Sequence, residues 1–178
     1  MTLVVNLMGP PGTGKSTMAA EIFAMLKWEG VNCELVGEFA KELVWEERHE
    51  TMKDEDYLFA KQAHRLFRLQ DKVDVIVTDR PLVLSVMYND MYGDKSNEFR
   101  KYVLHTVNKY NNMNILLKRT KPYVEEGRVQ TEAESNEMAN TIIQLLADSD
   151  IDYSVFPATS ESSKEIVKLI MQYLREHK

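Results

Sequence analysis

The sequence predicts an α/β fold in which five parallel strands form one sheet with helices on both faces. Short apolar runs alternate along the chain with longer segments of helical spacing, and we find no internal repeat or low-complexity linker. Parallel strands need crossovers of about a dozen residues or more, which the helical segments supply. A chain of 178 residues is of ordinary size for one domain, so we expect a single domain over residues 1–178.

The elements at the start of the chain follow from local patterns. Residues 3–8 form a continuous apolar run with the length of a buried strand, and residues 16–26 are typical of a helix. Residues 32–37 predict a short second strand, and a helical stretch follows at about 40–47. The single cysteine, Cys33, lies in this second strand, where we expect a buried and inert thiol.

The middle of the chain predicts a long helix and a third strand. Apolar residues from Leu58 to Phe67 recur near helical spacing, which indicates a helix at about 55–71. Residues 51–54, Thr-Met-Lys-Asp, resemble a capping box at its start. Residues 73–78 then predict the third strand, and the acidic residue Asp79 directly follows it.

The second half of the chain continues the alternation. The expected helices are 82–91, 97–111, 132–147 and 162–175, and the expected strands are 114–118 and 153–156. In an open parallel sheet, ligands bind beyond the carboxyl ends of the strands. Polar residues that directly follow a strand are therefore the candidates for a functional site.

Composition limits the classes of function. The chain has 22 basic and 28 acidic residues and a net charge of −6, which disfavours duplex DNA but leaves room for a local basic groove. We see no apolar run of membrane-spanning length, and the chain enters its first strand directly, so we expect neither a membrane segment nor a leader. These features favour the cytoplasm, or the host cytoplasm if the chain is phage-encoded.

Residues 9–16, Gly-Pro-Pro-Gly-Thr-Gly-Lys-Ser, match the Walker A pattern at every position. Because the run lies between a predicted strand and a predicted helix, its backbone amides and the helix N-terminus can surround phosphate groups. We expect ATP to bind here, with Lys15 at the β- and γ-phosphates and the Ser16 hydroxyl on Mg²⁺. The expected nucleotide-binding residues are Gly9, Pro10, Pro11, Gly12, Thr13, Gly14, Lys15, Ser16, Thr17 and, after the fourth strand, Arg119.

Acidic residues follow the second and third strands. Asp79 ends an apolar strand as in a Walker B motif, so we expect it to hold Mg²⁺ together with Ser16. Its alternative role is to cap the helix after Pro81. Glu38 follows the second strand, where it can accept a proton from an attacking hydroxyl; its alternative role is to favour the dipole of the next helix.

Three arginines are candidates to stabilise charge on a transferring phosphoryl group: Arg80, Arg119 and Arg128. Each of them, taken alone, is also typical of a solvated or paired surface residue. Arg128 lies in a polar, glycine-containing stretch between a strand and a helix. We expect residues at about 119–131 to form a short lid that closes over ATP and excludes water.

These motifs together resemble the P-loop kinases of the nucleoside and nucleotide kinase group. More narrowly, the chain is similar to the ribosylnicotinamide kinase domain of bacterial NAD regulators and to small phage-encoded AAA-like kinases. The matching segments are 9–17, 38–41, 77–80, 91–93 and 122–128, in the order of that family. Two positions depart from the ribosylnicotinamide kinases: Lys41 replaces the usual arginine, and Asp79-Arg80 is closer to the pair in thymidylate kinases.

The resemblance implies a three-layer P-loop kinase fold with strand order 2-3-1-4-5. It also implies ATP–Mg²⁺ as the phosphoryl donor and a hydroxyl of a nucleoside- or nucleotide-type molecule as the acceptor. The expected enzyme is an ATP-dependent phosphotransferase with an alcohol group as acceptor, in which either Glu38 or Asp79 is the base. The expected catalytic residues are Lys15, Glu38, Asp79, Arg80 and Arg128.

Two alternatives stay open. A second similarity is to the phage 5-hydroxymethyluracil DNA kinases, for which modified DNA is the acceptor; the compact chain suits a phage enzyme. A basic groove that uses Lys41, Arg65 and Arg68 would favour this alternative, and Gln62 on the same helix is a weak candidate to read a base edge. The other alternative is a P-loop ATPase or nucleotide switch, which would turn over ATP without any acceptor.

Overall fold

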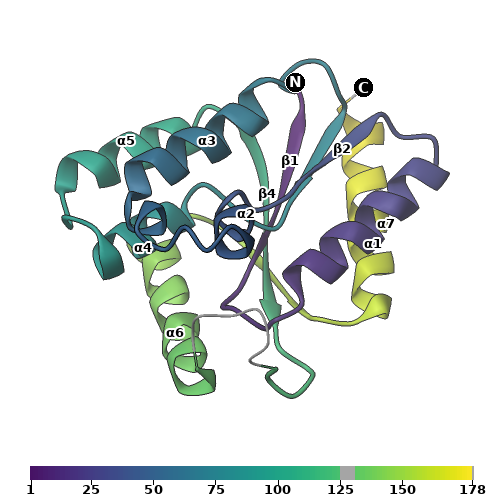
Figure 1. Ribbon diagram of the computed structural model, residues 1–178. Helices are drawn as coiled ribbons and strands as arrows, with labels where there is room; N and C mark the ends of the chain where they lie inside the picture. Colours follow the sequence, from purple (N-terminus) through teal and green to yellow (C-terminus); the bar gives the residue numbers. More distant parts are fainter. Residues whose placement is uncertain (125–130, 178) are drawn as a thin grey trace.

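Five parallel strands form the centre of the computed structural model, in the order β2-β3-β1-β4-β5 (Figure 1). The structure describes residues 1–124 and 131–177. The strands are β1 (Leu3–Met8), β2 (Cys33–Val36), β3 (Val75–Thr78), β4 (Asn111–Lys118) and β5 (Ser154–Pro157). The predicted parallel sheet and its strand order are confirmed.

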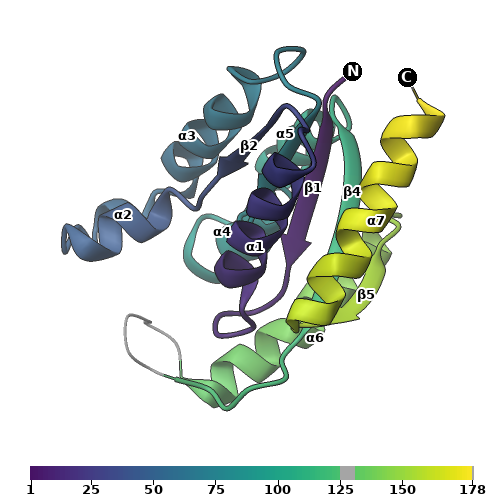
Figure 2. The same cartoon turned by 90° about the vertical axis from the view of Figure 1, so that its right-hand side faces the viewer.

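Helices cover both faces of this sheet and make the fold a three-layer one (Figures 1 and 2). One face carries α1 (Lys15–Trp28) and α7 (Ser160–Glu176). The opposite face carries α3 (Glu55–Phe67), α4 (Leu84–Tyr92), α5 (Asn97–Val107) and α6 (Glu132–Asp148). The short α2 (Ala40–Trp45) and the 3₁₀ turn η1 (Thr51–Lys53) lie between β2 and α3 along the chain.

Two apolar cores lie above and below the sheet, and β1 contributes to both. Leu3, Val5 and Leu7 pack toward α1 and α7, whereas Val4 and Met8 pack toward the helices of the other face. This division follows from the alternation of side chains along a strand. A central parallel strand is buried on both faces, which explains why residues 3–8 are almost uninterruptedly apolar.

The exception in β1 is Asn6, which is buried but fully accommodated by polar neighbours. Its side-chain amide donates hydrogen bonds to the side chains of Asn112 (2.9 Å) and Asn114 (3.0 Å) on β4. These bonds let polar residues enter the strand, because a buried amide is costly only when it lacks partners. Strand β4 begins at Asn111, three residues before the predicted start. Helix α5 correspondingly ends at Val107, earlier than expected.

The capping box expected at residues 51–54 is wrong. The side chain of Asp54 accepts a hydrogen bond from the Tyr57 amide and caps α3 alone, while residues 51–53 form the 3₁₀ turn before it. A capping box does occur at the start of α6, where Thr131 and Glu134 each bond to the backbone amide of the other. Within the described residues, no helix combines the length and the apolar character needed to cross a membrane.

Two adjacent isoleucines in α6 provide a test of the packing on the α3–α6 face. Ile142 is fully buried, whereas Ile143 is 43% exposed. We expect Ile142→Ala to lower the free energy of unfolding by about 2–5 kcal/mol, because the truncation leaves a cavity. We expect Ile143→Ala to lower it by less than about 1 kcal/mol. Urea denaturation followed by circular dichroism compares the two variants, and equal losses would contradict this placement of α6.

Candidate active site

A glycine-rich loop joins β1 to α1, as the Walker A pattern predicts. Gly14, the residue before α1, has a φ of 99°, a left-handed conformation that favours glycine. A side chain at Gly9 would meet the Thr13 side chain at 3.1 Å and the Leu117 carbonyl at 3.3 Å. The sequence therefore forms this tight loop because glycine stands at the positions where the backbone turns or approaches another strand.

Two hydroxyl groups hold the loop in place, one from the loop itself and one from α6. Thr13 Oγ1 donates a hydrogen bond to the Pro10 carbonyl (2.7 Å), and Ser135 Oγ from α6 donates one to the Pro11 carbonyl (2.8 Å). The Lys15 ammonium group donates to the carbonyl oxygens of Gly9 (2.8 Å) and Pro10 (3.0 Å). Lys15 thus lies back over the loop at the entrance to α1.

A cleft of about 790 Å³ opens directly beside this loop. Its walls bring together residues that the sequence analysis selected from separate strand ends: Pro11, Gly12, Gly14, Lys15, Ser16, Thr17, Glu38, Asp79 and Arg80. Gly9, Pro10 and Thr13 belong to the loop but do not line the cleft. The carboxyl ends of β1, β2 and β3 therefore contribute to one site, as the topology of the sheet requires.

Asp79 stands at the end of β3 with one oxygen unsatisfied. The side chain is buried, and its Oδ1 atom has no hydrogen-bond partner among the described residues. Burial, and secondarily the nearby Glu38 carboxylate, raise the pKa of Asp79, while Lys15 and Lys41 act in the opposite direction. A buried carboxylate oxygen without a partner is costly unless a cation or a donor meets it.

These residues fit a magnesium ion. Asp79 and the Ser16 hydroxyl offer hard oxygen ligands from the same cleft, and Mg²⁺ is usually held by one or two protein oxygens together with substrate phosphates. Among the described residues, no group of three or more His, Cys, Asp or Glu side chains could hold a metal ion by itself. The site therefore suits a metal that arrives with a phosphate ligand.

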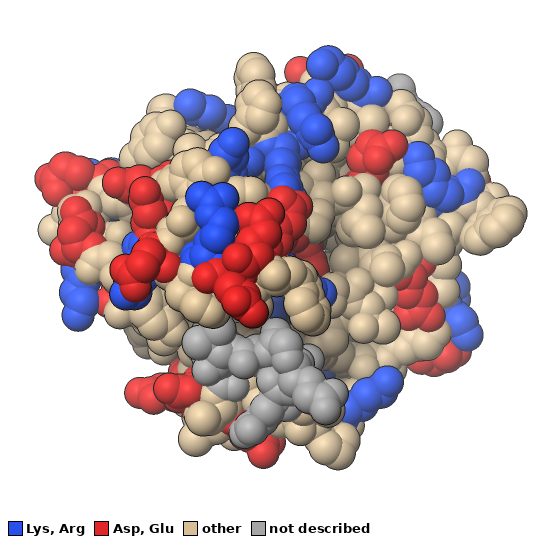
Figure 3. Space-filling view, in the orientation of Figure 1, with Lys and Arg blue, Asp and Glu red and all other residues tan. Residues whose placement is uncertain are grey.

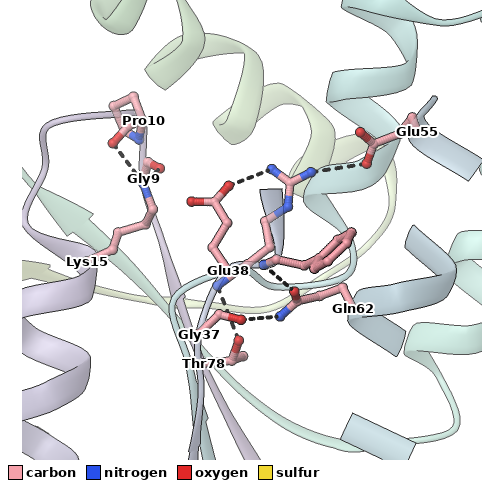
Figure 4. Close-up of polar contacts among 10 residues, drawn as sticks. Gly9, Pro10, Lys15, Gly37, Glu38, Glu55, Gln62 and Thr78 are labelled. Carbon is pink, nitrogen blue, oxygen red and sulfur yellow. Dashed lines mark hydrogen bonds and ion pairs between the residues drawn. The ribbon is translucent and has the colours of Figure 1, made fainter. Parts of the chain in front are cut away.

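Arg80 is buried between two carboxylates. Its guanidinium group lies 3.1 Å from Glu55 of α3 and 3.5 Å from Glu38 (Figure 4). The centre of the guanidinium group lies 3.9 Å from the ring centre of Tyr88. Burial raises the pKa of Glu55, and Arg80 works against this shift. Arg80 thus orients Glu38 at the edge of the cleft, whereas the sequence analysis expected it at the phosphoryl group.

Sequence reasoning missed Glu55 and Tyr88. Both line the cleft and both contact Arg80, but they come from α3 and α4, and no motif surrounds them. Burial raises the pKa of Tyr88 to about 12, so its hydroxyl stays protonated at neutral pH. The only local signal was the position of Glu55 in the first turn of a helix, where an acidic residue is common for electrostatic reasons.

Arg119 lies at the base of the predicted lid and not in the cleft wall. Its Nη2 atom donates to Glu132 (2.9 Å) and Asn136 (2.7 Å) at the start of α6, and its guanidinium centre lies 5.3 Å from the ring centre of Tyr123. From the lid segment, Lys121, Pro122 and Val124 do line the cleft. Arg128 and the rest of the lid up to residue 130 lie outside the described residues, so their roles stay predictions.

Comparison with known proteins identifies the family. Residues 4–164 match the model of an AAA domain family, and the chain therefore belongs to that family. A solved structure with the same fold is described as the "Crystal structure of NadR protein in complex with NR", with a TM-score of 0.73 and 15% sequence identity. The match covers 94% of this chain but 51% of the NadR chain, so this chain spans about half the length of that protein. The search of curated proteins finds no match.

The buried position of Arg80 leads to a prediction about stability. We expect Arg80→Met to lower the free energy of unfolding by about 3–5 kcal/mol, because Glu38 and Glu55 would lose the cation between them. The matched control is Arg48→Met, since Arg48 pairs with Glu46 at 3.4 Å on the exposed surface. We expect that variant to change stability by about 0–1 kcal/mol. Thermal unfolding measures both, and a mild effect of Arg80→Met would argue against a structural ion pair.

Proposed function

We propose that this AAA domain protein is an ATP-dependent phosphotransferase that moves the γ-phosphoryl group onto a hydroxyl of a nucleoside-type acceptor. The observation that carries the proposal is the shared cleft. One side is the Walker A loop with Lys15 and Ser16, and the other side presents the carboxylate of Glu38 beside Asp79. A phosphate cradle and a carboxylate that share one cleft suit direct transfer between two bound substrates.

In the proposed reaction, the acceptor oxygen bonds to the γ-phosphorus while the bond from that phosphorus to the bridging oxygen breaks and ADP leaves. Lys15 and the loop amides hold the phosphates, and Glu38 takes the proton of the hydroxyl. Ser16 and Asp79 would hold Mg²⁺, which would neutralise charge on the phosphates. We assign the base to Glu38 because Arg80 orients its carboxylate, while the unpartnered Oδ1 of Asp79 suits a cation.

The wall around Glu38 indicates the chemistry of the acceptor. Aromatic and apolar side chains dominate it: Val44, Trp45, Met52, Leu58, Tyr88 and Tyr92. Such surfaces bind flat rings by stacking and by burial of apolar area. The structure of the NadR protein was solved with NR. At 15% identity that likeness supports the fold, so the proposal for the acceptor rests on this wall.

The charges of the same wall favour a nucleoside over a nucleotide. Glu38 and Glu55 line it, and Arg80 is already paired with both. Besides Arg80 and the lysine of the Walker A loop, the described basic side chains that line the cleft are Lys41 and Lys121. An acceptor with its own phosphate would bring that phosphate beside the carboxylates of Glu38 and Glu55, whereas a neutral or cationic nucleoside avoids that repulsion.

The surface outside the cleft does not favour DNA as the acceptor. Three basic residues near α2 are paired with acidic neighbours: Arg48 with Glu46, Lys53 with Glu50, and Arg65 with Glu42. Figure 3 shows acidic side chains standing beside the basic ones on this face of the molecule. Phosphate backbones bind where basic charge is uncompensated, and the net charge of −6 adds to the repulsion.

The test is transfer of a radiolabelled γ-phosphate from ATP–Mg²⁺ to four classes of acceptor: nucleosides, nucleoside monophosphates, nicotinamide riboside, and DNA that contains hydroxymethyluracil. We expect transfer to an uncharged or cationic nucleoside. Lys15→Ala should leave the protein folded and reduce the rate of transfer by at least about 100-fold, because the substitution removes a cation that contacts the phosphates. Transfer to DNA alone, or ATP turnover that no acceptor stimulates, would overturn the proposal in favour of a DNA kinase or an ATPase.

The role of Glu38 gives a further prediction. We expect Glu38→Gln to reduce kcat by about 100-fold or more, with the KM for ATP nearly unchanged, since the amide cannot accept the proton. The matched control is Glu34→Gln, because Glu34 lies exposed on β2, the strand that precedes Glu38, and pairs with Lys27 at 3.6 Å. Steady-state kinetics compare the variants. Weaker ATP binding with unchanged turnover of bound ATP would show that Glu38 is not the base.

A further inference from the structure

The turn that carries Glu38 lies beyond the reach of the sheet. Strand β2 is an edge strand of four residues, and its last paired residue is Val36, opposite Thr78 of β3. Gly37, Glu38 and Phe39 follow before α2 begins at Ala40. The N-cap of α2, Phe39, makes no side-chain capping bond. Side chains from elsewhere must therefore hold this turn if Glu38 is to keep one position.

Gln62 of α3 supplies that hold. Its Oε1 atom accepts a hydrogen bond from the Phe39 amide (3.0 Å), and its Nε2 atom donates one to the Gly37 carbonyl (3.3 Å) (Figure 4). One side-chain amide thus brackets the two peptide groups on either side of Glu38. Gln62 is only 2% exposed, so its burial excludes the base-reading role considered from the sequence.

Neighbouring residues of α3 strengthen the same contact. Arg65 donates a second hydrogen bond to the Gly37 carbonyl (3.3 Å), and its guanidinium centre lies 5.0 Å from the ring centre of Phe39. Tyr57 packs edge-on against the Phe39 ring at 5.6 Å. Helix α3 therefore provides a face against which the turn docks, and Gln62 is the member that bonds to both ends of it.

We propose that Gln62 is a positioning residue for Glu38. The inference rests on the proposed function, in which Glu38 is the base. The backbone of Glu38 is fixed by Gln62 and its carboxylate by Arg80, which Glu55 of the same helix anchors. Glutamine suits the role because one side chain offers both an acceptor and a donor. Catalysis by positioning depends on such supports, since a displacement of about 1 Å can cost about 100-fold in rate.

The test compares Gln62→Met, which keeps the length of the side chain and removes both bonds, with Thr2→Val. Thr2 is also buried and also bonds to two backbone groups, the Val73 carbonyl (2.7 Å) and the Asp71 amide (2.8 Å), but at the amino end of β1. We expect Gln62→Met to lower kcat about 10–100-fold while the KM for ATP changes less than about twofold. Thr2→Val should lower stability alone. Equal kcat values for the two variants would overturn the proposal.

A double-mutant cycle separates positioning from general destabilisation. In the Glu38→Gln background, Gln62→Met should reduce the remaining transfer by less than about twofold, because the group it positions is already inactive. The same factor in both backgrounds would show that Gln62 does not act through Glu38. If Glu38→Gln alone leaves transfer intact, Glu38 is not the base. The single variant gives that result without any change at Gln62.

Amide hydrogen exchange tests the contact without an acceptor and without a variant that must fold. We expect the Phe39 amide of the unmodified protein to be protected, because it donates to a buried oxygen. Rapid exchange at Phe39 in the unmodified protein would overturn the proposal.

Discussion

The parallel direction of the strands is the constraint from which the site follows. Because all five strands run the same way, the chain segments that leave their carboxyl ends meet at one edge of the sheet. The order β2-β3-β1 places the Walker A loop, Asp79-Arg80 and Glu38 after three adjacent strands. Residues far apart in the sequence, such as Ser16 and Arg80, thus share a cleft.

That convergence buries two carboxyl groups of the cleft, those of Asp79 and Glu55. Burial raises the pKa values of Asp79 and Glu55, and in both cases nearby basic groups only partly oppose the shift. Raised carboxylate pKa values mean that a cation arriving in the cleft is stabilised there. A magnesium ion that arrives with the proposed donor would meet the unpartnered Oδ1 atom of Asp79.

Local sequence features predicted the parts of the site that depend on local structure. The Walker A run needs only a strand, a glycine turn and a helix in sequence, and Asp79 needs only the end of an apolar strand, so both could be located in advance. Glu55, Gln62 and Tyr88 could not, because their roles arise when α3 and α4 pack beside the ends of β2 and β3. The same limit applies to Asn6, whose partners on β4 lie more than 100 residues away.

The residues of the proposed chemistry are held in two different ways, by buried contacts around Glu38 and by the exposed helix α2. The proposed base, Glu38, is held by Gln62 and Arg80, and Glu55 in turn pairs with Arg80. Part of the proposed acceptor wall, Val44 and Trp45, instead comes from α2, which projects from the edge of the molecule (Figure 2) and whose Trp45 is 72% exposed. Exposed positions tolerate substitution far better than buried networks do. The arrangement would therefore allow the acceptor to change through α2 while the geometry of proton removal stays the same.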